Sequence, residues 1–211
     1  MRMRNKPWVS AFLEQYSGSV LTDPLTLKGR WKAVLNCPIL HVEIGSGKGD
    51  YWLLMAQNHP DEGWIGIEKE PNCAAIALKK AQNLALANIR FILDDAAGID
   101  QWFSPQEVDV IHLNFSDPWP KKRNTKRRLT HTNFLKQYAV LLSADGKIIM
   151  KTDNQQLFEF SLLSLQPDWL LEDISVDFRK IERPDAITEY ERKFMQENKP
   201  IYRAVWRKRI V

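Results

Sequence analysis

From residue 38 onward, short apolar runs alternate with longer segments in which apolar residues recur at helical spacing. The runs predict strands at 39–45, 64–68, 89–94, 108–115 and 147–152, and the spaced segments predict helices at 48–59, 71–87, 130–142 and 153–165. Two further runs, 169–178 and 201–208, are expected to form a closing antiparallel pair around a helix near 188–197. This alternation is typical of an α/β domain with a mainly parallel sheet.

Length and composition indicate one domain. A chain of 211 residues with 44% hydrophobic content suffices for one sizeable core. We expect a basic arm at residues 1–35, followed by a single domain at 36–211. The sequence contains neither a membrane-length apolar window nor a signal-peptide pattern, which predicts a cytoplasmic protein. Cys37 and Cys73 lack metal-site spacing and are expected to be free thiols.

A glycine-rich loop follows the first predicted strand. In "EIGSGKGD", Gly45, Gly47 and Gly49 allow the backbone to come close to a ligand. A dinucleotide fingerprint would need glycine where Asp50 stands, and a phosphate-binding P-loop would need serine or threonine after Lys48. The spacing therefore disfavours dehydrogenases and nucleotide hydrolases.

Acidic residues stand at the ends of the first three predicted strands, where open parallel sheets bind ligands. Glu43 precedes the glycine loop, Glu68 ends the second strand, and Asp94 and Asp95 end the third. Together they suit the ammonium, ribose hydroxyl and adenine amino groups of S-adenosylmethionine. The alternative is that these acids only end strands or cap helices.

A stiff acidic turn precedes the most basic stretch of the chain, "NFSDPWPKKRNTKRR". Asp117 follows the fourth strand, and Pro118 and Pro120 restrict the backbone around it. Residues 121–128 hold six cations and no acid, enough to contact several phosphates of a polynucleotide. We interpret this as a division of roles, in which the cations hold the nucleic acid and Asp117 meets the base. The alternative for the cations is an ordinary solvated face.

Across nearly its whole length the chain resembles bacterial tRNA (guanine-N7-)-methyltransferases of the TrmB type. The matching stretches are "MRMRNKPW", "EIGSGKGDY", "WIGIEKE", "NFSDPWPKKRNTKRRLTHTNFL", "KTDNQQLFEFSL", "TEYERKF" and "PIYRA". The resemblance implies a class I, Rossmann-like methyltransferase fold with a mostly parallel seven-stranded sheet. It also implies S-adenosylmethionine as donor and methylation of guanine 46 in the variable loop of tRNA.

The resemblance also assigns residues to roles. It implies that Glu43, Glu68, Asp95 and Asp117 line the donor and active site, with Asp117 as the catalytic residue. The expected substrate contacts are Lys121, Asp153, Thr188, Glu189, Tyr190 and Glu191. The expected RNA-binding stretch is Arg123, Asn124, Thr125, Lys126, Arg127 and Arg128. For Asp153, an N-cap is the alternative.

Guanine N7 carries a lone pair and no hydrogen, so its methylation needs no catalytic histidine. The four histidines show no metal-ligand spacing, and strand or helix-end structural roles are expected for them. We expect no metal and a monomer or homodimer. The rival hypotheses are a methyltransferase acting on an exocyclic amino group, a catalytically silent RNA-binding protein and an NAD-dependent oxidoreductase.

Overall fold

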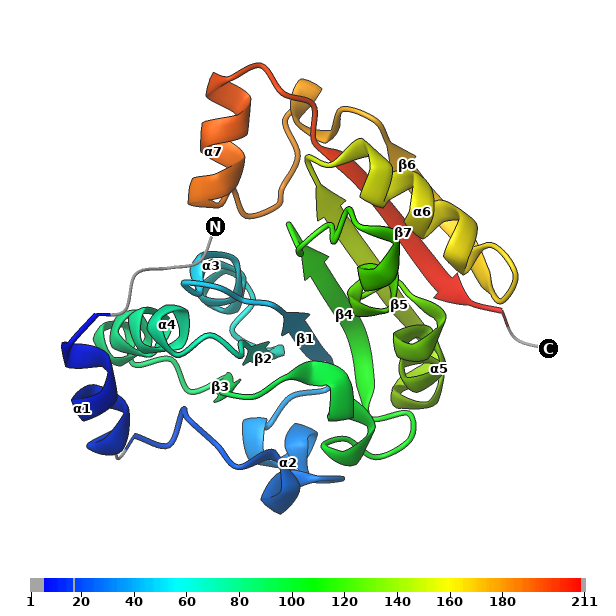
Figure 1. Cartoon of the computed structure of the whole chain (residues 1–211). Helices are drawn as coiled ribbons and strands as arrows, with labels where there is room; N and C mark the ends of the chain where they lie inside the picture. Colours follow the sequence, from blue (N-terminus) through cyan, green and yellow to red (C-terminus); the bar gives the residue numbers. More distant parts are fainter. Residues whose placement is uncertain (1–5, 17, 210–211) are drawn as a thin grey trace.

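The computed structural model describes residues 6–16 and 18–209. Its centre is a seven-stranded sheet in the order β3-β2-β1-β4-β5-β7-β6 (Figure 1). The strands are β1 (Leu40–Ile44), β2 (Gly63–Ile67), β3 (Ile89–Ile92), β4 (Val108–Asn114), β5 (Leu142–Thr152), β6 (Trp169–Ser175) and β7 (Tyr202–Lys208). The first five are parallel, and β7 runs antiparallel to both β5 and β6.

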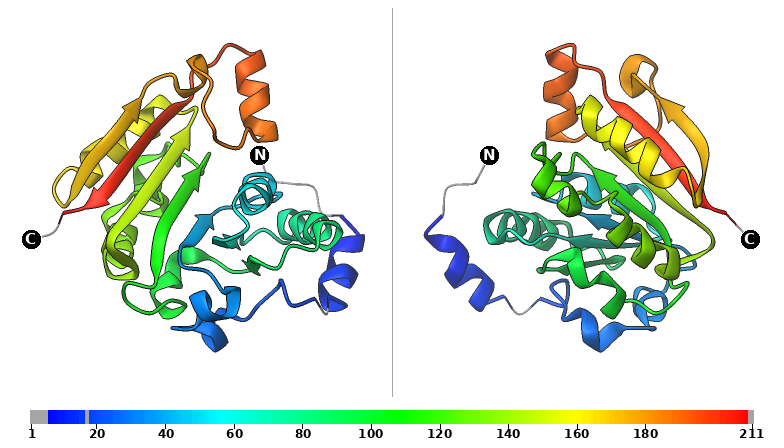
Figure 2. Two further views of the ribbon diagram at one scale, coloured as in Figure 1. Left: turned by 180° about the vertical axis from the view of Figure 1, so that it is seen from behind. Right: turned by 45° about the vertical axis from the view of Figure 1, so that its right-hand side comes forward.

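Helices cover both faces of this sheet (Figure 2). The α-helices are α1 (Trp8–Glu14), α2 (Trp31–Leu35), α3 (Asp50–Asn58), α4 (Pro71–Leu84), α5 (Thr132–Leu141), α6 (Gln155–Leu165) and α7 (Glu189–Gln196). Short 3₁₀ helices are η1 (Pro24–Leu27), η2 (Ala96–Gln101), η3 (Lys122–Arg127) and η4 (Phe178–Lys180). One apolar cluster joins α2, α5 and α6 to the sheet, and a second joins α3 and α4. In the described residues, no helix combines the length and apolarity needed to cross a bilayer.

Burial and capping explain the central elements. Every residue of β1 and β2 is buried, as expected for parallel strands covered on both faces. Helix α4 begins at Pro71, and the side chain of Glu70 accepts a hydrogen bond from the backbone N–H of Cys73. Cys37 and Cys73 are free, as predicted.

The predicted order of strands and helices is confirmed, including the antiparallel pair β6 and β7 around α7. One predicted boundary is wrong: the residues between the predicted helix 130–142 and the predicted strand 147–152 do not separate α5 from the fifth strand. Strand β5 starts directly at Leu142, which pairs with Val108, and the next pair joins Lys147 to Val110. Residues 143–146 therefore lie inside β5, at the point where the register of its pairing with β4 shifts.

The segment before residue 36 packs against the sheet. Trp31 is fully buried, and its indole N–H donates to the carbonyl of Trp102 at 2.9 Å. Leu35 lies in the same core cluster. Near β3, the backbone N–H of Phe91 donates to the carbonyl of Val20, and Thr22 donates to the carbonyl of Phe91. The division at residue 36 stays a prediction, and residues 1–5 and 17 of the predicted arm lie outside the described residues.

Candidate active site

Glu43, near the carboxyl end of β1, is the buried acid of the site. Its Oε1 accepts a hydrogen bond from Asn114 Nδ2 at 2.8 Å, whereas its buried Oε2 has no partner among the described residues. Burial raises the pKa of Glu43 to about 7, although the hydrogen bond from Asn114 opposes the rise. A carboxylate with one free oxygen suits a ligand ammonium group, as the sequence predicts.

The glycine loop after β1 leaves space in front of this acid. Gly45 has φ 81° and Gly47 has φ 55°, and a Cβ at either position would meet no atom within 4 Å. The same atom on Gly49 would lie 2.9 Å from the Cβ of Ala77 on α4. Gly45 and Gly47 therefore border open space for a ligand, whereas Gly49 allows close helix packing.

Glu68 follows β2 and is fixed by the loop. Its Oε2 accepts from the backbone N–H of Gly47 at 3.0 Å, and its Oε1 accepts from the backbone N–H of Glu70 at 2.8 Å. Each carboxylate oxygen retains a second lone pair. Glu68 is thus oriented to accept further hydrogen bonds, as a ribose diol requires.

Asp95 is engaged at the end of the third strand. Its Oδ1 caps η2 by accepting from Ala97 N–H at 3.1 Å, so the predicted capping alternative is realised, and its Oδ2 lies 3.0 Å from Lys69 Nζ. Partial burial acts to raise the pKa of Asp95, but these partners and the charge of Arg127 lower it overall. Asp94 accepts from the backbone N–H of Asp95. The donor contact predicted for Asp95 stays a prediction.

The turn that carries exposed Asp117 follows β4. Phe115 and Trp119 adopt left-handed φ values of 50° and 41°, which are uncommon for aromatic residues. The N–H of Phe115 donates to the carbonyl of Lys151, and the ring of Phe115 lies 5.7 Å from that of Phe194 on α7. The turn is therefore held in a strained form between β5 and α7, as is common at functional sites.

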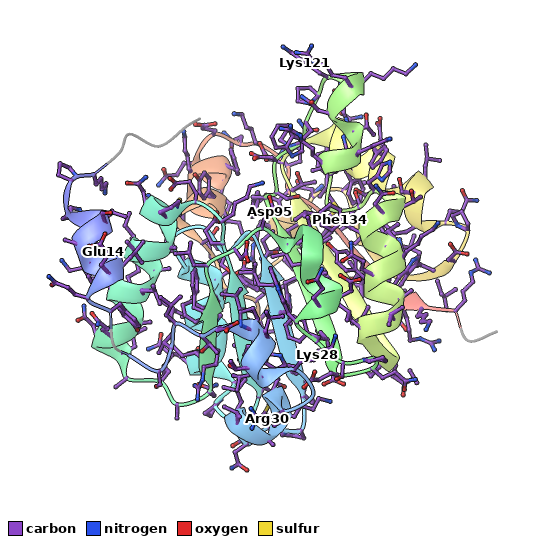
Figure 3. All side chains as sticks on the ribbon, turned by 60° about the horizontal axis from the view of Figure 1, so that its bottom comes forward. Glu14, Lys28, Arg30, Asp95, Lys121 and Phe134 are labelled. Atoms are coloured by element: carbon purple, nitrogen blue, oxygen red, sulfur yellow. The ribbon has the colours of Figure 1, made fainter. Side chains whose placement is uncertain are left out.

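The predicted RNA-binding residues divide into two groups. Arg123, Lys126 and Arg127 are exposed, as is Lys121, the predicted substrate contact before them, which projects into solvent (Figure 3). Arg128 instead donates from Nε to the carbonyl of Pro118 at 2.9 Å, and its guanidinium stacks over Phe160. Through the bond to Pro118, Arg128 holds the turn that carries Asp117. Arg127 lies over the ring of Trp119, with its Cζ 4.9 Å from the ring centroid.

The residues expected to contact substrate near α7 also differ in exposure. Tyr190 is exposed, whereas Thr188 and Glu191 are buried and form a capping box at the amino end of α7. Glu189 is the first residue of α7. Asp153 is exposed and does not cap α6, because Asn154 accepts from the N–H of Leu157 instead. The N-cap alternative for Asp153 is therefore wrong.

The histidines have the predicted structural positions. His41 and His112 lie on β1 and β4, with His41 Nδ1 3.0 Å from His112 Nε2, and burial lowers the pKa of both. His59 follows α3, and His131 caps α5. Within residues 6–16 and 18–209, no group of three His, Cys, Asp or Glu side chains is arranged to hold a metal ion.

Sequence reasoning missed two residues that support the site. Asn114, which holds Glu43, is a polar residue ending a buried strand, and that signal was visible in the sequence. Lys151 is a cation at the end of a buried strand, and its side chain is fully buried. Its partner Asp185, and Arg179, which pairs with the same Asp185, come from the segment between β6 and α7, which has no local pattern, so they could not be predicted from the sequence.

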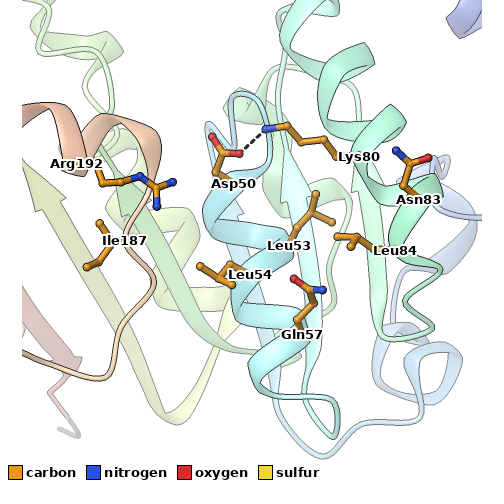
Figure 4. Close-up of a pocket in the computed structure, with 9 residues that line it drawn as sticks. All are labelled: Asp50, Leu53, Leu54, Gln57, Lys80, Asn83, Leu84, Ile187 and Arg192. Carbon is orange, nitrogen blue, oxygen red and sulfur yellow. Dashed lines mark hydrogen bonds and ion pairs between the residues drawn. The ribbon is translucent and has the colours of Figure 1, made fainter.

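A separate depression of about 370 Å³ lies between α3, α4 and the start of α7 (Figure 4). Its lining is Asp50, Leu53, Leu54, Gln57, Lys80, Asn83, Leu84, Ile187 and Arg192. None of the predicted donor acids lines it, and an ion pair between Asp50 and Lys80 lies at one edge. The chemistry expected at the carboxyl ends of the strands therefore belongs to the Glu43 region.

Comparisons with known proteins match the chain to methyltransferases. A family model described as "Putative methyltransferase" matches residues 38–204. A tRNA (guanine-N(7)-)-methyltransferase of Oceanobacillus iheyensis is 43% identical, covering 96% of this chain and 97% of that protein. The Bacillus subtilis protein of the same name is 41% identical, with 97% of each chain covered.

Solved structures support the fold. The 16S rRNA methyltransferase KamB has a TM-score of 0.63 at 12% identity, covering 86% of this chain and 92% of that one. A SAM-dependent methyltransferase from Aquifex aeolicus has a TM-score of 0.58 at 13% identity, covering 96% and 98%. The sheet is thus that of class I, Rossmann-like, SAM-dependent methyltransferases.

Proposed function

Because the chain belongs to the bacterial tRNA (guanine-N7-)-methyltransferase family, we propose that it methylates N7 of guanine 46 in the tRNA variable loop. The family relationship rests on the nearly full-length relatives. The observation that carries the site assignment is the free buried oxygen of Glu43 beside an open glycine loop. The exposed Asp117 turn and its cations extend from the same edge of the sheet.

The residues present fit S-adenosylmethionine. Glu43 would receive the ammonium group, Glu68 the ribose hydroxyls, and Gly45 and Gly47 leave room for the donor backbone. Asp95 would accept a hydrogen bond from the adenine amino group in place of its present contact with Lys69. When bound, the donor supplies an electrophilic methyl group on a sulfonium.

The protein's main task is alignment, because guanine N7 needs no base to remove a proton. Holding two reactants in line saves much of the entropy of bringing them together. Asp117 would accept hydrogen bonds from guanine N1 and the amino group, or offset the positive charge that develops on the ring. Tyr190, which is exposed, would stack on the guanine ring, and Lys121 and Asp153 would complete the substrate contacts.

The RNA contact would come from the exposed cations of η3 and its neighbours. Lys122, Arg123, Lys126 and Arg127 are exposed on one short segment directly after the Asp117 turn. Phosphate contacts from this segment would fix the position of the nucleic acid without reading its sequence. Arg128 contributes indirectly, by fixing the turn.

The test uses labelled S-adenosylmethionine and an unmodified tRNA transcript, followed by nucleoside mass spectrometry. We expect 7-methylguanosine at position 46 and no product when that position carries 7-deazaguanosine, which lacks the nucleophilic nitrogen. N6-methyladenosine or N2-methylguanosine as the product would favour the amino-group alternative. Donor binding without methylation of any tRNA would favour a silent RNA-binding protein.

Asp117→Asn tests the catalytic residue. We expect at least about a hundredfold loss of methyl transfer with donor affinity unchanged, because the amide cannot supply the negative charge. The matched control is Asp61→Asn, which changes an exposed acid in the turn before β2, at the other end of the sheet. Equal turnover of the two variants would remove Asp117 from the mechanism.

A further inference from the structure

Lys151 is a buried cation at the carboxyl end of β5. Its side chain has no exposed area, and its Nζ lies 2.7 Å from Asp185 Oδ2 and 3.2 Å from Glu191 Oε1. The same Nζ lies 4.4 Å from the ring centroid of Tyr51 on α3. A buried ammonium group requires such partners. Lys151 therefore links β5 to α3, to the loop that carries Asp185 and to α7.

Arg179 completes what we call the Lys151 cluster, formed by Lys151, Arg179, Asp185 and Glu191. Its Nη2 lies 3.2 Å from Asp185 Oδ2 and 2.8 Å from Glu191 Oε1, and it also donates to the carbonyl of Ala186. Two cations balance two acids. Buried ion pairs of this kind are better at fixing a geometry than at adding stability, and removing one partner leaves an uncompensated charge.

The cluster also acts on the donor pocket. Lys151 pairs with Asn114 in the register of β4 and β5, and Asn114 donates to Glu43 Oε1. Burial raises the pKa of Glu43, whereas the hydrogen bond from Asn114 and the positive charge of Lys151 lower it. Burial raises the pKa of Tyr51, next to the glycine loop, and the charges of Asp185, Glu43 and Glu191 act in the same direction. The groups that act on the Glu43 carboxylate thus come from β4 and β5, and Tyr51 of α3 lies within reach of its charge.

We propose that Lys151 is a positioning residue that couples the donor pocket to α7. It holds the amino end of α7 against the sheet, where Tyr190 is exposed, and it supplies positive charge to the carboxylate that receives the donor ammonium. This inference rests on the proposed function, but it makes a separate statement about how donor affinity depends on pH.

The experiment measures donor affinity by calorimetry between pH 5.5 and 9, without tRNA. Glu43 must be ionised to hold an ammonium group, so affinity is expected to fall as the pH drops through about 7. In Lys151→Met the midpoint of this fall is expected to rise by about one pH unit, because an opposite charge near an acid is worth at least that much. Lys151→Arg is expected to return the midpoint toward that of the wild type.

The matched control is Lys147→Met, the same change on the same strand, at a partly exposed ion pair with Glu172. We expect it to leave the midpoint unchanged. Lys151→Met is also expected to raise the KM for tRNA by about tenfold or more, because α7 loses its anchor. Circular dichroism reports whether each variant is folded.

If Lys151→Met does not fold, the experiment uses the double variant Lys151→Met with Glu191→Gln instead. This double variant removes one charge of each sign, so it leaves no uncompensated buried charge. A wild-type midpoint in the folded variant would overturn the inference while leaving the proposed methylation intact. A wild-type protein that binds no donor at any pH would reject the proposed function and this inference together.

Discussion

At the scale of single residues, Glu43 is expected to bind the donor in its ionised form, although burying this charge lowers the stability of the fold. An unfolded glutamate loses its proton near pH 4.5, whereas burial raises the pKa of Glu43 to about 7 in the folded protein. The unfolded state therefore releases this proton first. The contribution of Glu43 to the free energy of unfolding falls as the pH rises from about 4.5 to about 7, and it stays low above that range.

Glu43→Gln removes this effect. We expect the donor-free variant to be more stable than the wild type by about 3 kcal/mol at pH 8, and by much less at pH 5, while it loses donor binding. Urea unfolding at the two pH values measures the difference. Glu159→Gln, an exposed change on α6, is the control and is expected to have no effect at either pH. A Glu43→Gln stability gain of the same size at both pH values would contradict the assignment.

At the same scale, the sequence predicted the position of Glu43 but not its environment. An acid at the end of a buried strand is a local pattern, readable from "HVEIG". Its hydrogen bond from Asn114 depends on β4 lying beside β1, a contact between residues 71 positions apart. The positive charge that lowers the pKa of Glu43 belongs to Lys151, which lies on a third strand, β5.

At the scale of elements, the basic segment is expected to separate into two functions. Arg128→Ala removes hydrogen bonds to the carbonyls of Pro118 and Trp119 and the contact with Phe160. We expect it to lower kcat, and to lower stability by about 1–3 kcal/mol, since hydrogen bonds from charged groups are of that order. The salt dependence of tRNA binding is expected to stay as in the wild type.

Lys126→Ala is the matched change two residues earlier, at an exposed cation of η3. We expect tRNA affinity to fall and the slope of log affinity against log salt to decrease by about one, with kcat unchanged. Filter binding over a range of salt concentrations gives both slopes. A reduced slope for Arg128→Ala at wild-type kcat would return Arg128 to the group of phosphate contacts.

Periodicity predicted the order of elements well, because β1 and β2 are short, fully buried runs and helices such as α5 bury one apolar face. The prediction failed where turn-forming residues lie inside a strand. Ser143 to Gly146 would end a strand in isolation, yet Leu142 is fully buried and pairs with β4 before them. Tertiary packing decided the start of β5, and no local pattern reports it.

At the scale of the whole molecule, the two tryptophans before residue 36 differ in their environment. Trp31 is fully buried against Phe103 and donates a hydrogen bond to the carbonyl of Trp102. Trp8, on α1, remains 38% exposed and packs edge-on against Phe12. A composition-based boundary at residue 36 groups these two residues together, although only one is part of the central core.

Replacing each tryptophan by alanine tests whether this segment is an appendage or part of the fold. Trp31→Ala is expected to lower the free energy of unfolding by about 3–5 kcal/mol, because it leaves a cavity and an unpaired carbonyl in the core. Trp8→Ala is expected to cost about 1 kcal/mol or less, since much of its ring already faces water. Denaturant unfolding measures both values. Similar small losses for the two variants would mean that residues before 36 contribute little to the core and form a separable arm; a large loss confined to Trp31→Ala would mean that the methyltransferase domain begins before that residue.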